Sequence, residues 1–192
     1  MSVIGHNNGP AMGQGRGWRT YCWRAARREL LPHMPLNVVR RRVKRAAELG
    51  LAYPAYARIH ATAGRDILAF LFSTNALQII RDTDPLPGDR AEFLNAQQAC
   101  ATLSLAHPPL EPDSVARRLS LATGREVTAR RAPPAFANWA EVRAAVRTPA
   151  LAVSLPADSV LVVGDTSLER DWCAAAAMAG YLSADQIFAQ PI

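Results

Sequence analysis

A short aliphatic run, a glycine and a capped helix near the C-terminus constrain the fold of this chain more than any other stretch. Val160–Val163 is continuously aliphatic, as in a strand that is buried on both faces. Gly164 then permits a sharp turn. Thr166 and Glu169 have the spacing of a capping box, in which both side chains accept hydrogen bonds from backbone N–H groups at a helix start. A strand, a turn and a helix in this order predict an α/β unit.

The helix that follows this turn has one apolar face. The residues expected on that face are Leu168, Trp172, Ala175 and Ala179. Trp172 is therefore predicted to be buried against the sheet, and Gly180 is predicted to end the helix.

The rest of the chain alternates between helical and strand-like segments. Helices are expected over 18–31, 38–49, 54–63, 91–101, 114–123 and 138–147, and strands over 125–131 and 151–155. Residues 66–80 are the most apolar segment, and their periodicity does not separate a buried strand from a buried helix. A helix that begins at Asp66 is the favoured interpretation.

These elements predict an α/β protein in which an N-terminal helical module precedes a small α/β body with a partly parallel sheet. A loop rich in proline and glycine over 81–90 is the expected domain boundary. The predicted organisation is a disordered tail over 1–17, an arginine-rich helical module over 18–80 and an α/β domain over 91–192.

The charge is unevenly distributed along the chain. There are 22 basic and 16 acidic side chains, for a net charge of +6. Residues 16–65 contain 12 of the basic side chains and only two acidic ones, Glu29 and Glu48, and so carry a net charge of +10. This asymmetry predicts an anionic partner, either DNA or RNA or an acidic protein. The alternative is that the abundance of arginine and alanine only reflects a GC-rich genome.

The composition favours a cytoplasmic protein with no membrane partner. No run approaches the ~20 apolar residues of a membrane span, and the first 17 residues lack the profile of a secretory signal. The three cysteines are widely spaced, which is typical of free thiols in a reducing compartment. The segment Ile4–Pro10 resembles the openings of alphaproteobacterial mobile-element proteins, which implies a bacterial origin.

The segment 46–59 resembles a helix-turn-helix. Ala46 stands four residues before Gly50, Leu51 follows the glycine, and Ile59 falls where the second helix would pack inward. The resemblance implies a recognition helix over 54–63, with the preceding helix against phosphates. The predicted nucleic-acid-binding residues are Arg40, Arg41, Lys44, Arg45, Tyr53, Tyr56 and Arg58. An ordinary helical hairpin with a solvated arginine face is the alternative.

The strand and turn at 160–171 resemble the last acidic motif of haloacid-dehalogenase-like phosphatases, whose carboxylates hold Mg²⁺. Glu169 stands where that family has its second aspartate, and the Asp-x-Asp nucleophile motif is absent. The nearest candidates for that motif are Ser73 and Thr74, which carry no carboxylate, so no active phosphatase is expected.

A milder form of this resemblance is a phosphate or nucleotide site at a helix N-terminus. The predicted ligand-binding residues are Gly164, Asp165, Thr166 and Glu169. Mg²⁺ is an expected cofactor only under this alternative. The same residues are also compatible with a capped turn that binds no ligand.

Taken together, the sequence favours an intracellular nucleic-acid-binding protein, a DNA-binding regulator, over an enzyme. The first alternative is a small α/β protein that binds a nucleotide or phosphate, or a degenerate phosphatase-like protein. The second is a protein–protein adaptor whose basic helices meet an acidic partner.

Overall fold

The computed structural model describes residues 34–188. The tail expected over 1–17 and the helix expected over 18–31 lie outside the described residues. The chain divides into two compact units, Met1–Arg40 and Arg41–Ile192. The boundary between them falls within helix α2 (Leu36–Glu48). The architecture described below is that of the second unit.

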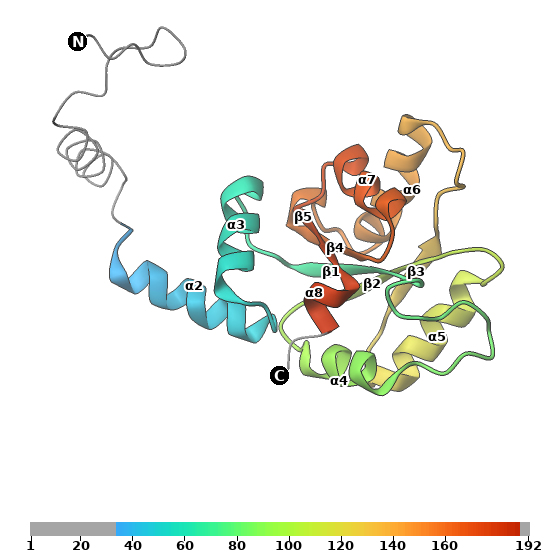
Figure 1. Ribbon diagram of the computed structural model, residues 1–192, viewed down its shortest axis with the longest axis horizontal. Helices are drawn as coiled ribbons and strands as arrows, with labels where there is room; N and C mark the ends of the chain where they lie inside the picture. Colours follow the sequence, from blue (N-terminus) through green and yellow to red (C-terminus); the bar gives the residue numbers. More distant parts are fainter. Residues whose placement is uncertain (1–33, 189–192) are drawn as a thin grey trace, which may run out of the picture. The chain divides into compact units, whose positions relative to one another are not determined.

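A five-stranded sheet forms the centre of this unit (Figure 1). Its strands are β1 (Ala69–Ser73), β2 (Ala101–Ala106), β3 (Thr128–Arg131), β4 (Val160–Gly164) and β5 (Gly180–Ser183). They lie in the order β3-β2-β1-β4-β5, and every neighbouring pair is parallel. The α/β fold class is therefore confirmed. The strand order reverses direction between β1 and β4, which creates a topological switch point at the carboxyl ends of these strands.

Helices cover both faces of the sheet. The remaining helices are α3 (Tyr53–Ala63), α4 (Gly88–Ala96), α5 (Pro112–Thr123), α6 (Trp139–Ala152), α7 (Ser167–Ala176) and α8 (Ala184–Phe188). Buried residues of α6 and α7 form one core cluster with the sheet, and buried residues of α3, α4, α5 and α8 form the other. None of the helices within residues 34–188 has the length and apolarity needed to traverse a lipid bilayer.

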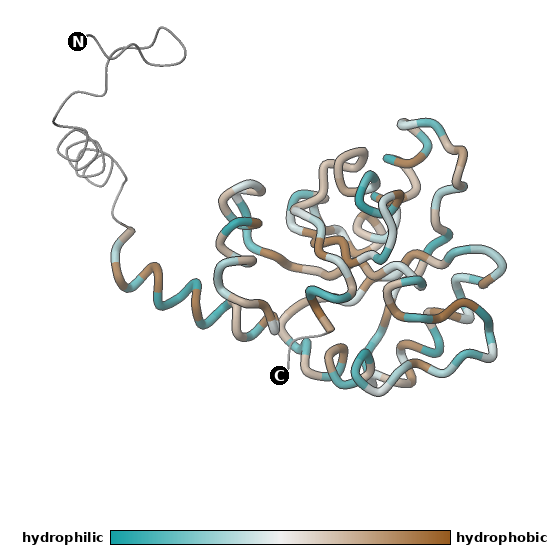
Figure 2. Tube along the Cα trace, in the orientation of Figure 1, coloured by the Kyte–Doolittle hydropathy of each residue, from teal (hydrophilic) through white to brown (hydrophobic). Residues whose placement is uncertain are grey.

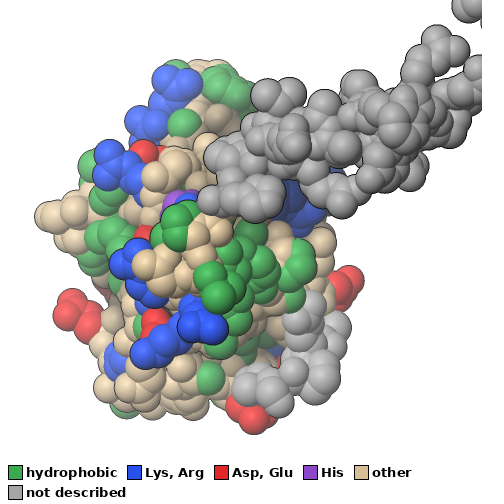
Figure 3. Space-filling model, turned by 90° about the vertical axis from the view of Figure 1, so that its left-hand side faces the viewer, with side chains coloured by type: hydrophobic (Ala, Val, Ile, Leu, Met, Phe, Trp, Pro, Cys, Tyr) green, Lys and Arg blue, Asp and Glu red, His purple; other side chains and the backbone are tan. Residues whose placement is uncertain are grey.

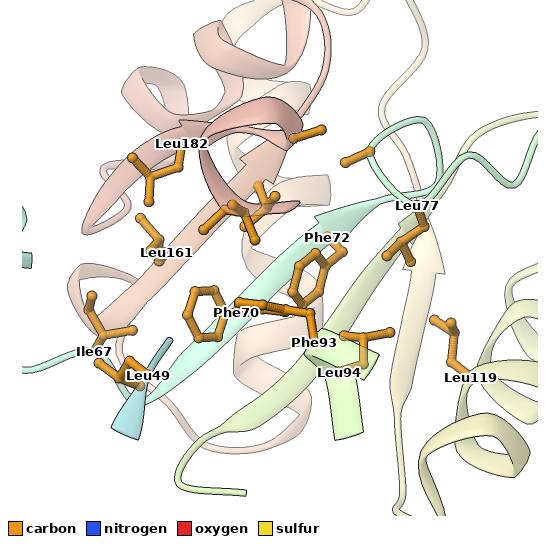
Figure 4. Packing of buried hydrophobic residues seen from close by; sticks show 14 of the residues in the cluster. Leu49, Ile67, Phe70, Phe72, Leu77, Phe93, Leu94, Leu119, Leu161 and Leu182 are labelled. Carbon is orange, nitrogen blue, oxygen red and sulfur yellow. The ribbon is translucent and has the colours of Figure 1, made fainter. Parts of the chain in front are cut away.

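The central strands are apolar because both of their faces are covered. Phe70 and Phe72 point into the core beneath α4, where Phe93 packs edge-on against both rings (Figure 4). Leu71 lies in the opposite core, beneath α6 and α7. The run Val160–Val163 alternates between the two cores in the same way, and Figure 2 shows the resulting band of hydrophobic residues along β1 and β4. This is the arrangement that the unbroken aliphatic run predicts.

The helix expected from Asp66 is a wrong prediction, because residues 69–73 form the central strand β1. A short apolar run suits either element, and here pairing with β2 and β4 on both sides decides for a strand. Residues 81–87 of the expected boundary loop therefore lie in the connection from β1 to α4 inside the α/β body, residues 88–90 begin α4, and no boundary between domains falls there. The helix α3 also belongs to this body, because Tyr56 and Ile59 lie in the same core cluster as β1.

Three further predictions need correction. The helix expected over 91–101 is α4, which ends at Ala96, and Ala101 already begins the strand β2, which was not predicted. No strand forms at 151–155, because α6 continues through Pro149 to Ala152 and buries one helical face against the sheet.

The helix α7 ends at Ala176, before the predicted stop at Gly180, which instead begins β5. Arg143 and Arg147 of α6 donate from Nε to the last carbonyls of α7, those of Ala175 (2.9 Å) and Ala176 (2.7 Å). These side chains satisfy backbone groups that a helix end leaves unpaired. The chain can then turn at residue 177, whose φ is 51°, and enter the last strand.

Candidate functional site

Helices α2 and α3 form a tight hairpin at the position of the predicted helix-turn-helix. Gly50 has a φ of 60°, and the N–H of Leu51 donates to the carbonyl of Ala46 at 2.9 Å. A Cβ on Gly50 would lie 2.7 Å from Nε2 of Gln97, so the absence of a side chain also lets α4 and the segment after it approach the turn. Ala46, Leu51 and Ile59 are buried. Hairpins of this kind occur with and without a nucleic-acid ligand.

Two of the predicted nucleic-acid contacts face inward. Arg45 donates from Nε to Asp66 at 2.8 Å and from Nη2 to the carbonyl of Ile67 at 2.8 Å. Tyr56 is buried and donates its hydroxyl hydrogen to Asp66 at 3.0 Å. Burial and this hydrogen bond raise the pKa of Tyr56 to about 12. Both side chains join the hairpin to the segment before β1. Neither is therefore included among the nucleic-acid contacts considered below.

The other predicted contacts remain near or at the surface. Arg41 and Arg58 are exposed, and their side chains form no hydrogen bond or ion pair within residues 34–188. The side chain of Lys44 is 81% exposed and lies 3.9 Å from Glu48, and Tyr53 is half-buried against the core. Arg40 is exposed and falls in the first unit. Figure 3 shows groups of exposed Lys and Arg side chains on the side of the molecule that is at the left in Figure 1.

A second cluster of polar side chains lies at the switch point between β1 and β4. The buried carboxylate of Glu169 accepts hydrogen bonds at Oε2 from the backbone N–H groups of Asp165 (2.6 Å) and Thr166 (2.9 Å). At Oε1 it accepts from Nε2 of His107 (2.8 Å) and Nδ2 of Asn75 (3.1 Å). An ionised carboxylate has no hydrogen to donate, so Nε2 of His107 carries the proton in this pair.

These donors control the ionisation of Glu169. Burial alone would raise its pKa, because the charged form is poorly solvated inside the protein. The hydrogen bonds from His107, from the N–H groups of the turn and from Ser73 outweigh burial and lower the pKa from 4.5 to about 2. Glu169 is therefore a buried anion at neutral pH.

His107 is held from three directions. Its backbone N–H donates to Oγ1 of Thr74 at 3.1 Å, its ring donates to Glu169, and the ring stacks on Trp172 with 5.3 Å between centroids. The prediction of a ligand site at the 164–169 turn included neither His107 nor Asn75. His107 directly follows β2, and Asn75 stands two residues after the end of β1. Polar residues just after parallel strands are the signal that could have identified them.

Gly164 has a packing role at this cluster. A Cβ at this position would lie 2.8 Å from Cβ of Glu169 and 2.9 Å from Cε2 of Tyr181. The absence of a side chain therefore allows the Glu169 carboxylate to reach the backbone of the turn, and Tyr181 to cover it.

Replacing Gly164 by alanine is expected to lower the free energy of unfolding by about 1–3 kcal/mol, because the new methyl group overpacks a closed site. Gly88→Ala is the matched control, since a Cβ there meets nothing within 4 Å. Urea denaturation followed by circular dichroism measures both variants. Equal stabilities of the two variants would contradict the packing role of Gly164.

The cluster fits a structural role better than a phosphate site. Both N–H groups of the turn that would hold a phosphate oxygen already bind Glu169. The exposed carboxylate of Asp165 would also repel an anion. Within the described part of the chain, no group of three or more His, Cys, Asp and Glu side chains is arranged to hold a metal ion. The Mg²⁺ that is expected only under the nucleotide or phosphate alternative stays a prediction.

Comparisons of the chain with protein-family models, with curated proteins and with solved structures find no match.

Proposed function

We propose that this protein binds nucleic acid through the phosphate backbone, using the exposed cationic side chains of the α2–α3 hairpin. Arg41, Lys44 and Arg58 are the residues of the second unit that would make these contacts. The main support is the way the hairpin is anchored: its apolar face lies in the protein core while these side chains remain exposed. A rigid element with exposed cations attracts phosphates without having to order itself first.

The exposed side of α3 offers little for reading bases. Pro54 and Ala61 are exposed, and Arg58 is the long polar side chain available between them. Direct readout of the base sequence depends on side chains such as Arg, Asn and Gln, each of which can form two hydrogen bonds to the edge of one base. Phosphate contacts position a protein on the duplex but carry no sequence information. The proposal is therefore binding that does not depend on the nucleic-acid sequence. It does not extend to the sequence-specific regulation expected of a DNA-binding regulator.

The salt dependence of duplex binding tests this function. Each neutralised phosphate contributes about −0.9 to the slope of log Kobs against log salt concentration. The double variant Arg41→Ala/Arg58→Ala should bind more weakly and lower the magnitude of the slope by about 2. The full-length chain, a generic DNA duplex and fluorescence anisotropy at several salt concentrations provide the measurement.

A matched control removes two cations elsewhere on the body. Arg81 and Arg130 are exposed and lie outside the hairpin, so Arg81→Ala/Arg130→Ala should leave the slope unchanged. Absence of binding at low salt, or equal slopes for the two double variants, would refute the proposal. Binding of polyglutamate as tight as that of DNA would favour the adaptor alternative.

The nucleotide or phosphate alternative at the 164–169 turn has weaker support. The backbone N–H groups of this turn already donate to Glu169. Strand β1 ends at Ser73 and is followed by Thr74 and Asn75, where a phosphatase-like nucleophile would need a carboxylate. A ligand at this turn would first have to displace a buried carboxylate from its hydrogen bonds.

A further inference from the structure

The carboxylate of Asp66 links both helices of the α2–α3 hairpin to the start of the central strand. Its Oδ2 accepts a hydrogen bond from Nε of Arg45 on α2 at 2.8 Å, and its Oδ1 accepts from the hydroxyl of Tyr56 on α3 at 3.0 Å. Oδ1 also accepts from the backbone N–H of Ile67 at 2.9 Å, which fixes the carboxylate just before β1. One side chain therefore connects three parts of the chain.

Helix α2 depends on these polar contacts because little of it is packed in the core. Among its 13 residues, all of which the structure describes, Ala46 is the buried one, and Leu49 is buried just after the helix ends. Apolar packing has no preferred direction, so these two contacts do not fix the direction of the helix. Hydrogen bonds are directional. The guanidinium of Arg45 binds Asp66 through Nε and the carbonyl of Ile67 through Nη2, so it holds α2 in one orientation.

The charge of Asp66 acts in the opposite direction to these contacts. Its side chain is 39% exposed and lies against Arg45, a residue of the basic helix. A carboxylate in such a place repels phosphates, so on charge alone its removal should strengthen nucleic-acid binding. Loss of its contacts should instead weaken binding, because a hairpin that is not held in one geometry has to be ordered by the ligand.

We infer that Asp66 is the positioning residue of the hairpin, and that its contacts outweigh its charge. It sets how α2 and α3 are held against the body, and with this the spacing of the cations Arg41, Lys44 and Arg58 that phosphates meet. The inference rests on the proposed nucleic-acid binding and adds to it the residue on which the geometry of the site depends.

Replacing Asp66 by asparagine separates the two effects. The substitution removes the negative charge and places an NH₂ group opposite Nε of Arg45, where two donors cannot bond to each other. The affinity of the full-length chain for a generic DNA duplex should fall by at least about 3-fold, which fluorescence anisotropy at low salt measures.

Asp158→Asn is the matched control. Oδ2 of Asp158 lies 2.8 Å from Nε of Arg65, the same two atoms and the same distance as in the pair of Asp66 with Arg45. Arg65 follows α3 and belongs to neither helix of the hairpin. This variant loses the same charge and keeps the anchoring contacts, so it should bind the duplex as tightly as the wild type or more tightly.

Tyr56→Phe tests the anchoring without a change of charge. It keeps the buried ring and removes the link to α3, so it should also weaken duplex binding. Hydrogen exchange followed by mass spectrometry should be faster over 41–63 in Asp66→Asn and Tyr56→Phe than in the wild type, and unchanged in β1 and β4. Asp158→Asn should exchange like the wild type. If Asp66→Asn does not fold, Tyr56→Phe decides the outcome by both measurements.

Duplex binding that both Asp66→Asn and Tyr56→Phe leave unchanged or make tighter would overturn the inference, because charge would then outweigh anchoring. Unchanged hydrogen exchange in the hairpin would overturn it as well. A wild-type chain that binds no duplex would instead refute the proposed function, and the exchange rates would still decide whether Asp66 positions the hairpin.

Discussion

Replacing Trp172 by alanine is expected to lower the free energy of unfolding by about 3–5 kcal/mol, which is a large share of the stability of a domain this size. Trp172 is 1% exposed and is among the largest fully buried side chains of the protein. It lies in the core cluster between the sheet and α6 and α7, and its ring stacks on His107. The variant would therefore lose contacts in the core and beside the polar cluster at once.

Two other tryptophan variants calibrate this result. Trp139 is 55% exposed, so Trp139→Ala should change stability by less than about 0.5 kcal/mol. Trp172→Phe should lose less than Trp172→Ala, because it keeps an aromatic ring and removes a buried indole N–H that has no partner within the described residues. Urea denaturation followed by circular dichroism gives the three free energies. An unchanged midpoint for Trp172→Ala would show that α7 is not docked on the sheet as described.

Replacing Glu169 by glutamine is expected to lower stability at pH 7 by about 3 kcal/mol. The pKa of Glu169 falls from 4.5 to about 2 in the folded protein, and each unit of such a difference corresponds to about 1.4 kcal/mol of stabilisation. Glutamine also places an NH₂ group among donors, where it cannot accept their hydrogen bonds.

The effect of this substitution should depend on pH in a defined direction. Because the folded-state pKa lies below 4.5, the ionised carboxylate stabilises the protein fully above pH 4.5, and this stabilisation is lost as the pH falls toward 2. The difference between wild type and Glu169→Gln should therefore shrink over that range. Asp165→Asn is the control. Asp165 is exposed, so this substitution should change the free energy of unfolding by less than about 0.5 kcal/mol. A difference that is the same at pH 7 and pH 2 would show that the charge of Glu169 contributes nothing.

Local signals in the sequence predicted the part of the fold that depends on neighbouring residues. The capping box of Thr166 and Glu169 is present, and a second one joins Asn138 and Glu141 at the start of α6. The burial of Trp172 is likewise confirmed. These features depend on contacts within one or two helical turns, or on the apolar face of a single helix. A short stretch of sequence therefore contains the information needed to predict them.

Features that depend on distant residues could not be predicted in this way. Whether the apolar run at β1 forms a strand or a helix is decided by its pairing with β2 and β4, which lie far along the chain. Glu169 meets His107 and Asn75 across 62 and 94 residues of sequence, and only the strand order brings them together. The helical pattern also places Arg45 outward, and its contact with Asp66 depends on how the hairpin docks.

The sheet order has a consequence for the synthesis of the protein. The central strand β1 stays unpaired along one edge until β4 has left the ribosome, and β4 begins 91 residues after β1 begins. The hairpin at the start of the body depends on an even later segment, because Ile59 of α3 packs against Gly180 at the beginning of β5. Non-local parallel pairing forms slowly. A nascent chain that stops before β4 would therefore expose an apolar strand edge to other chains, and the docking surface of its α3 would be incomplete.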